Sequence, residues 1–194
     1  MTADPVAPTA AHTATAFARR TTPIAALASD ADALAATCRA MAQRFRRGGR
    51  LLAMGTGPAA ADAAHVVVEF VHPVIVGKRA LPALALPGGG SATTVELFGA
   101  ADDIALVFSP DGAEPDLAAA MAAAVRRQLL TVALLGGGVD GRGGRVAAVA
   151  GLDHVIVVPS TDRRVVREAH VTAYHVLWEL VHVFLDAPEA PGDH

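Results

Sequence analysis

His65 and Glu69 stand four residues apart within an apolar segment of the chain. On a helix this spacing places the imidazole and the carboxylate one turn apart on the same face, where they can share a substrate or a metal ion. The run Gly55-Thr56-Gly57 comes shortly before them and is typical of a turn whose backbone approaches a ligand closely. The same spacing occurs in many helices without a site, so its meaning depends on the surrounding elements.

Those surrounding elements are predicted to be a strand, a turn and a helix. Residues 50–54 form an apolar run typical of a buried strand, and residues 60–72 are expected to form the helix that follows the turn. In open parallel sheets, ligands bind beyond the carboxyl ends of strands, where such turns meet helix N-termini. Gly55, Thr56 and Gly57 are therefore predicted to contact a ligand.

Strand and helix patterns alternate along the rest of the chain. Further strands are predicted at residues 81–86, 104–108, 130–135 and 154–158. Helices are predicted at residues 24–47, 116–128, 145–150 and 164–185. This alternation predicts an α/β fold, a three-layer sandwich in which a central parallel sheet of about five strands is flanked by helices.

The chain is expected to contain one domain, over residues 21–186. Its 194 residues, 53% of them hydrophobic, suffice for one substantial core. Residues 1–20 have no clear period and are predicted to be a mobile arm or a poorly defined first helix. Residues 187–194 are predicted to be a flexible tail.

Other glycine-containing loops follow the predicted strands. Gly88-Gly89-Gly90-Ser91, residues 109–114 and residues 136–144 each come after an apolar run. A single loop of this kind is more often a simple turn, but recurrence after successive strands favours a shared ligand crevice. Ser91, Ser109 and Gly112 are therefore added to the predicted ligand-binding residues.

Several ionisable side chains lie on the last predicted helix. His175 is seven residues after Glu168 and seven before His182, so these three share one stripe of the helix, whereas His170 points elsewhere. The stripe indicates either a site at His175 or a structural polar seam at a subunit contact. Each histidine taken alone is more often structural.

Composition limits the classes of function. A formal net charge of −3 does not suggest a nucleic-acid surface. The single cysteine, Cys38, excludes an internal disulfide, and the N-terminus has no secretory signal pattern, so we expect a cytoplasmic protein. No apolar run approaches the ~20 residues of a membrane span. The high apolar content is expected to supply an oligomer interface.

The ordered motifs resemble the sugar isomerase (SIS) domain proteins, and among them the phosphoheptose (sedoheptulose-7-phosphate) isomerases. The resemblance rests on residues 45–55, on Asp62 with His65-x-x-x-Glu69, and on residues 82–86, 140–144 and 167–175. It covers about residues 24–185. No single motif is specific, but their order is.

The resemblance implies a homotetramer that interconverts a phosphorylated ketose and an aldose through an enediol. Glu69 matches the general base, and His175 matches the acid that moves a proton between the two oxygens. Members that bind zinc use His65, Glu69, His175 and a glutamine, so a divalent metal is the one cofactor implied.

The chain departs from the family at several positions. Arg167 stands where the glutamine is expected, and an arginine offers no lone pair to a metal. Pro58 lacks an N–H group in the first glycine loop. Asp111 and Glu114 place carboxylates in the loop expected to bind phosphate, where they would repel a dianion. The interval between the second and third strands is also shorter than in the family by about one helix.

Two main hypotheses follow. The first is an aldose–ketose isomerase acting on a sugar phosphate of the sedoheptulose 7-phosphate type. The second is a non-catalytic SIS-fold protein that binds a metabolite or a partner protein and keeps a degraded phosphate site. A third, ranked lowest, is metal-assisted chemistry on a non-phosphorylated ligand. In each case the expected partners are a small molecule and further copies of the chain, without direct binding to nucleic acid or membrane.

Overall fold

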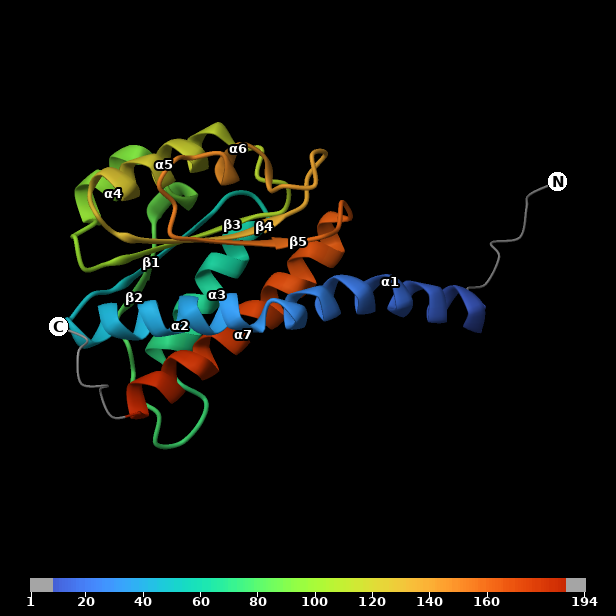
Figure 1. Ribbon diagram of the computed structural model, residues 1–194, viewed down its shortest axis with the longest axis horizontal. Helices are drawn as coiled ribbons and strands as arrows, with labels where there is room; N and C mark the ends of the chain where they lie inside the picture. Colours follow the sequence, from blue (N-terminus) through green and yellow to red (C-terminus); the bar gives the residue numbers. More distant parts are fainter. Residues whose placement is uncertain (1–8, 188–194) are drawn as a thin grey trace.

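Five parallel strands form the centre of the molecule in the computed structural model, which describes residues 9–187 (Figure 1). Their order across the sheet is β2-β1-β3-β4-β5. The strands are β1 (Leu51–Gly55), β2 (Ala83–Ala85), β3 (Ile104–Ser109), β4 (Leu130–Gly136) and β5 (His154–Val158). All four strand pairings are parallel, which confirms the predicted α/β fold class.

Helices cover both faces of the sheet (Figure 1). On one face lie α2 (Ala31–Arg46), α3 (Ala59–Val71) and α7 (Arg163–Asp186); on the other lie α4 (Ala92–Phe98), α5 (Pro115–Arg126) and α6 (Gly144–Ala147). Every residue of β1, β3 and β4 is buried. Strands covered on both faces are apolar throughout rather than alternating, which explains the continuous apolar runs in the sequence.

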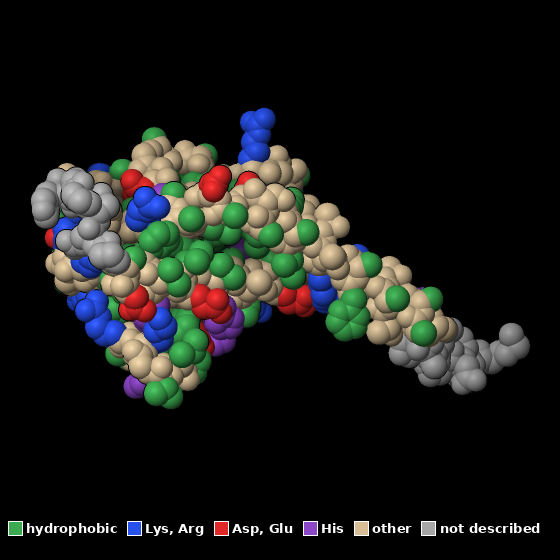
Figure 2. Space-filling view, turned by 60° about the horizontal axis from the view of Figure 1, so that its bottom comes forward, with side chains coloured by type: hydrophobic (Ala, Val, Ile, Leu, Met, Phe, Trp, Pro, Cys, Tyr) green, Lys and Arg blue, Asp and Glu red, His purple; other side chains and the backbone are tan. Residues whose placement is uncertain are grey.

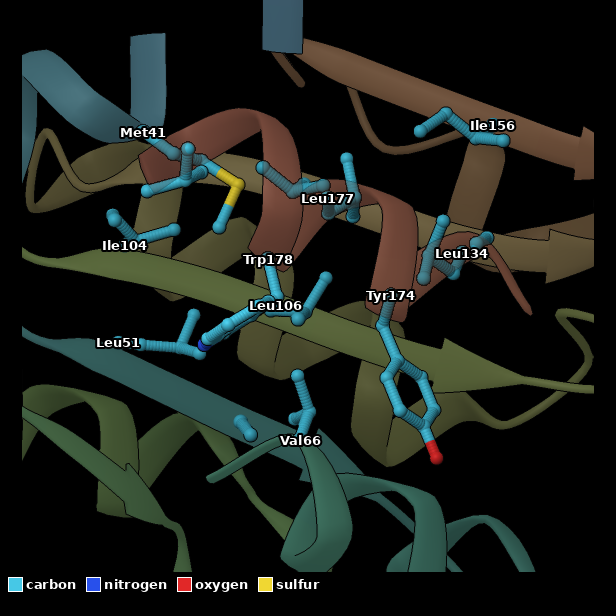
Figure 3. Close-up of a cluster of buried hydrophobic side chains, with 14 of the residues drawn as sticks. Met41, Leu51, Val66, Ile104, Leu106, Leu134, Ile156, Tyr174, Leu177 and Trp178 are labelled. Atoms are coloured by element: carbon cyan, nitrogen blue, oxygen red, sulfur yellow. The ribbon is translucent and has the colours of Figure 1, made fainter. Parts of the chain in front are cut away.

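Successive residues of β1 point to opposite cores. Leu51 and Ala53 belong to the larger cluster beneath α2, α3 and α7, while Leu52 and Met54 belong to the cluster beneath α4, α5 and α6. Figure 3 shows part of the larger cluster, in which α7 contributes Leu177 and other buried side chains. The larger core thus ties α3 and α7, which carry the candidate chemistry, to the same side of the sheet.

Of the two alternatives predicted for residues 1–20, a mobile arm and a poorly defined first helix, the described part is helical. Residues 10–20 are helical and belong to α1 (Ala10–Ser29), which Figure 1 shows running out from the body of the molecule. Its buried residues are Pro23 and Leu27, both in the C-terminal half, so residues 10–20 show no apolar stripe that would have revealed a helix. The helix predicted over residues 24–47 is two helices, because Asp30 ends α1 and begins α2.

The segment between β2 and β3 contains the short helices η1 (Pro87–Gly89) and α4. Within residues 9–187 no helix combines the length and apolar character needed to cross a bilayer. The predicted flexible tail lies, apart from Ala187, outside the described residues.

Candidate active site

His65, Glu69 and His175 come together between α3 and α7. The Nε2 atom of His65 lies 3.1 Å from Oε1 of Glu69, and Nε2 of His175 lies 3.8 Å from the same oxygen. The Glu69 side chain is only 13% exposed, whereas the two histidines remain accessible. One donor atom from each residue lies within 4.8 Å of the other two. The three side chains therefore form one accessible cluster around a shielded carboxylate.

Local packing explains this arrangement. On α3, Val66 and Phe70 are buried in the larger core, so the neighbouring positions, His65 and Glu69, lie along the border of the buried face. On α7, Tyr174 and Leu177 are buried and leave His175 half-exposed. The apolar stripes dock the two helices on the sheet, and the polar residues beside those stripes meet.

Tyr174 joins this cluster, and sequence reasoning missed it. Its hydroxyl lies 2.6 Å from Nδ1 of His65, and its ring makes edge contacts with His65 and His175. Figure 3 shows the ring extending from α7, with the hydroxyl beyond the labelled apolar side chains. It is the only tyrosine of the chain and directly precedes His175, the one signal that could have drawn attention to it.

The phenol of Tyr174 can set the tautomer of His65. Complete burial raises the pKa of Tyr174 to about 12, so the hydroxyl stays protonated at neutral pH. When it donates to Nδ1 of His65, the ring proton of His65 sits on Nε2 and is donated to Glu69. This chain of hydrogen bonds holds the Glu69 carboxylate in one orientation.

The donor set of the cluster suits a divalent metal. Two imidazoles and one carboxylate are ligands that zinc accepts, and three protein ligands leave a position for a substrate oxygen. Arg167 does not enter the cluster, because its guanidinium donates to both carboxylate oxygens of Asp62, at 2.8 and 3.0 Å. The carboxylate of Asp62 is buried, and this ion pair compensates the charges of both side chains.

The other ionisable residues of the last helix are distributed differently. Glu168 pairs with Arg20 of α1. His182 is buried, and its two ring nitrogens lie 2.9 and 3.0 Å from the carbonyl oxygens of Trp178 and Arg79. His170 is fully buried beside Phe108, and this burial lowers its pKa to about 4. Of the predicted stripe, only His175 reaches the cluster.

The loops after β1 and β3 meet at the point where the winding of the sheet reverses. Because β1 lies between β2 and β3, ligands of such folds bind beyond the carboxyl ends of β1 and β3. Gly55 ends β1, and Thr56, Gly57 and Pro58 follow it in the loop to α3. Gly57 has a positive φ of 54°, which glycine adopts without strain.

The loop after β3 satisfies its own polar groups. The Ser109 hydroxyl accepts a hydrogen bond from the backbone N–H of Gly112 at 2.7 Å and donates to Glu114 at 2.5 Å. Gly112 is buried, and a Cβ atom there would lie 1.8 Å from the carbonyl oxygen of Gly143. Glu114 therefore occupies the Ser109 hydroxyl, a donor that the loop would otherwise offer to an anion.

Replacing Glu114 by serine should strengthen the binding of inorganic phosphate about tenfold, because a repelling carboxylate is removed and Ser109 is released. Titration calorimetry at constant ionic strength measures the change. Asp116→Ser removes the same charge at an exposed position two residues further on and should leave the affinity unchanged. Equal affinity in the Glu114 variant and the parent would disprove the blocking role of Glu114.

Ser91 serves as a helix cap. Its hydroxyl accepts the backbone N–H of Thr94, and the Thr94 hydroxyl accepts the backbone N–H of Ser91. The preceding glycines lie against the end of β1, where a Cβ on Gly89 would be 2.4 Å from the Gly55 carbonyl oxygen. The loop thus reaches the predicted crevice, while a ligand contact by Ser91 stays a prediction.

Comparison with known proteins gives a consistent picture. No family model matches the sequence. The phosphoheptose isomerase of Desulfovibrio desulfuricans is 36% identical over 173 residues, covering 81% of this chain and 80% of its own. The phosphoheptose isomerase of Pelobacter propionicus is 33% identical over 156 residues, covering 73% of this chain and 79% of its own. The structure of a phosphoheptose isomerase from Francisella tularensis, 23% identical, superposes with a TM-score of 0.77 over 90% of this chain and 99% of its own.

Proposed function

Since the chain belongs to the phosphoheptose isomerase family of SIS-domain proteins, we propose that it is an aldose–ketose isomerase. Its substrate in this proposal is a sugar phosphate of the sedoheptulose 7-phosphate type, and the reaction passes through an enediol. The observation that carries the proposal is the convergence of His65 and His175 on Glu69 from two different helices. Incubation with sedoheptulose 7-phosphate, followed by separation of ketose and aldose products, tests it directly.

Glu69 is the general base in this mechanism. Its side chain is largely shielded from water, which favours proton transfer over solvation of the carboxylate. Oε1 faces both histidines, so we assign to Oε2 the removal of the proton from the carbon beside the carbonyl. The same oxygen returns that proton to the neighbouring carbon, which completes the isomerisation.

His175 moves the second proton. Its accessible imidazole stands beside Glu69 and transfers a proton between the two substrate oxygens as the double bond shifts. His65 donates to Glu69 and keeps the carboxylate in position. With the His65 ring proton on Nδ1, facing the Tyr174 hydroxyl, His65, Glu69 and His175 would hold a divalent ion such as zinc, which when bound would supply polarisation of the substrate carbonyl.

Replacing Tyr174 by phenylalanine should lower turnover about tenfold, because the group that orients His65 is lost while the ring remains. Nitrogen NMR shifts of His65 report the tautomer, and steady-state kinetics report the turnover. A structural role alone would leave the His65 shifts unchanged. Unaltered shifts together with parental turnover would refute the orienting role of the hydroxyl.

The second candidate function is a non-catalytic protein of the same fold that binds a metabolite or a partner protein. The observation that favours it is the Glu114 carboxylate bound to Ser109, since this contact closes the loop expected to hold phosphate. Binding of the sugar phosphate without any conversion would favour this candidate. Conversion that depends on Glu69 would exclude it.

Assembly into a homotetramer is also part of the proposal. An apolar groove of about 270 Å³ runs between α1, α2 and α7, lined by Ile24, Leu27, Ala28, Ala31, Leu34, Thr172, Ala173, Val176 and Leu180. Figure 2 shows hydrophobic side chains gathered on the body of the molecule from which α1 projects. A second copy would cover such a surface, and light scattering measures the resulting mass.

A further inference from the structure

A small pocket opens where the loops after β1 and β3 face the first turns of α7. It has a volume of about 240 Å³ and is lined by Thr56, Pro58, Pro110, Arg163, Arg164 and Arg167. The strand order makes this edge, between β1 and β3, the place where a ligand is expected. Half of the lining residues are arginines, and no residue of the lining carries a carboxylate.

Each of the three arginines is held by one acidic residue outside the lining. Arg167 pairs with Asp62 at 2.8 Å, Arg163 with Asp111 at 3.3 Å, and Arg164 with Asp162 at 3.0 Å. A guanidinium has five N–H donors, so one carboxylate partner orients it and leaves donors for a further ligand. These contacts preorganise the arginines.

The backbone at the start of α7 is not the anion-binding element. Asp162 caps this helix, and its carboxylate accepts the backbone N–H of Arg164 at 3.0 Å. The loop after β3 is likewise closed, because Glu114 holds the Ser109 hydroxyl. The guanidinium groups, together with the Thr56 hydroxyl, are therefore the side-chain donors that this pocket offers to an anion.

We propose that this arginine pocket binds the phosphate group of the sugar substrate, in place of the self-occupied loop after β3. The inference rests on the proposed function for the identity of the ligand. Arg167 precedes His175 by eight residues on α7, a rise of about 12 Å along the helix. An open-chain sugar phosphate can bridge this span, with its carbonyl at Glu69 and its phosphate at the arginines.

The first test uses inorganic phosphate as the probe, with ionic strength held constant by chloride. The double variant Arg163→Gln/Arg164→Gln removes two exposed arginines, with side chains 63% and 76% exposed. The matched control Arg47→Gln/Arg126→Gln removes the same charge from side chains that are 54% and 61% exposed and that also pair with acids. Calorimetry should show at least about tenfold weaker phosphate binding in the pocket variant and parental affinity in the control.

The outcomes separate the pocket from its alternatives. Equal weakening in both double variants would mean that phosphate responds only to net charge, and the pocket would be rejected. If Ser109→Ala weakened phosphate binding and the arginine changes did not, the phosphate site would be assigned to the loop after β3 and the pocket would be rejected. Failure of the parent protein to bind millimolar phosphate would also reject the pocket.

Kinetics with sedoheptulose 7-phosphate distinguish the two proposals. The pocket variant should show a raised KM with a nearly unchanged kcat, since the arginines lie away from the reacting carbons. If the pocket variant turned over the substrate with the parental KM, the proposed phosphate site would be rejected and the proposed isomerase function would be retained. Phosphate binding that requires the arginines, without any turnover by the parent, would support the pocket and overturn the isomerase.

Discussion

Replacing Glu69 by glutamine should reduce kcat by about 10²- to 10⁴-fold, the usual contribution of a general base. The amide has nearly the same shape as the carboxylate, so α3 and α7 should keep their packing. The glutamine amide cannot accept the proton from the substrate carbon at neutral pH. Steady-state assays of ketose-to-aldose conversion measure the effect, and circular dichroism and thermal melting verify the fold.

A matched carboxylate is available as the control. Glu179 is exposed on α7, one turn after His175, and makes no ion pair within the described residues. Glu179→Gln therefore removes the same charge close to the cluster and should keep full turnover. A Glu69 variant that retains more than about a tenth of parental kcat would exclude Glu69 as the base. Equal losses in both variants would attribute the effect to local charge.

Replacing Arg167 by glutamine should destabilise the protein by about 1–3 kcal/mol, because Asp62 would remain buried without its cation. A third of the Arg167 side chain is exposed, which keeps the expected loss below that of a fully buried pair. Denaturant titration measures the free energy of unfolding. Glutamine is the residue that the family resemblance suggests at this position, so a substitution toward the family is expected to be harmful.

A double-mutant cycle isolates the pair. Asp62→Asn combined with Arg167→Gln should be more stable than Arg167→Gln alone, because two neutral amides can hydrogen-bond and no charge stays buried. The control Arg126→Gln interrupts an exposed pair with Glu96 and should change stability by at most about 1 kcal/mol. Strictly additive losses in the cycle would show that Asp62 and Arg167 do not interact energetically.

Most of the fold could be predicted from the sequence, since it depends on local apolar patterns. The strands at residues 104–109, 130–136 and 154–158 are short apolar runs, and their predicted positions agree with β3, β4 and β5 to within a residue. The helix α1 was harder to predict, because none of the side chains of residues 10–19 is buried against the described part of the chain, and burial is what imposes an apolar stripe. A helix that buries no face produces no apolar periodicity in the sequence.

The sequence by itself determined the sheet, the two helices that carry the chemistry, and the pair His65 and Glu69, because these depend on spacing within one element. Only the tertiary structure decided which polar groups meet across elements. Tyr174 reaches His65 from 109 residues away, and Arg167 reaches Asp62 from 105. Apolar periodicity positions a helix but does not specify its polar contacts, which depend on how the helices dock. The packing of α7 against α3 therefore places Arg167 against Asp62, outside the cluster, and Tyr174 against His65, within it.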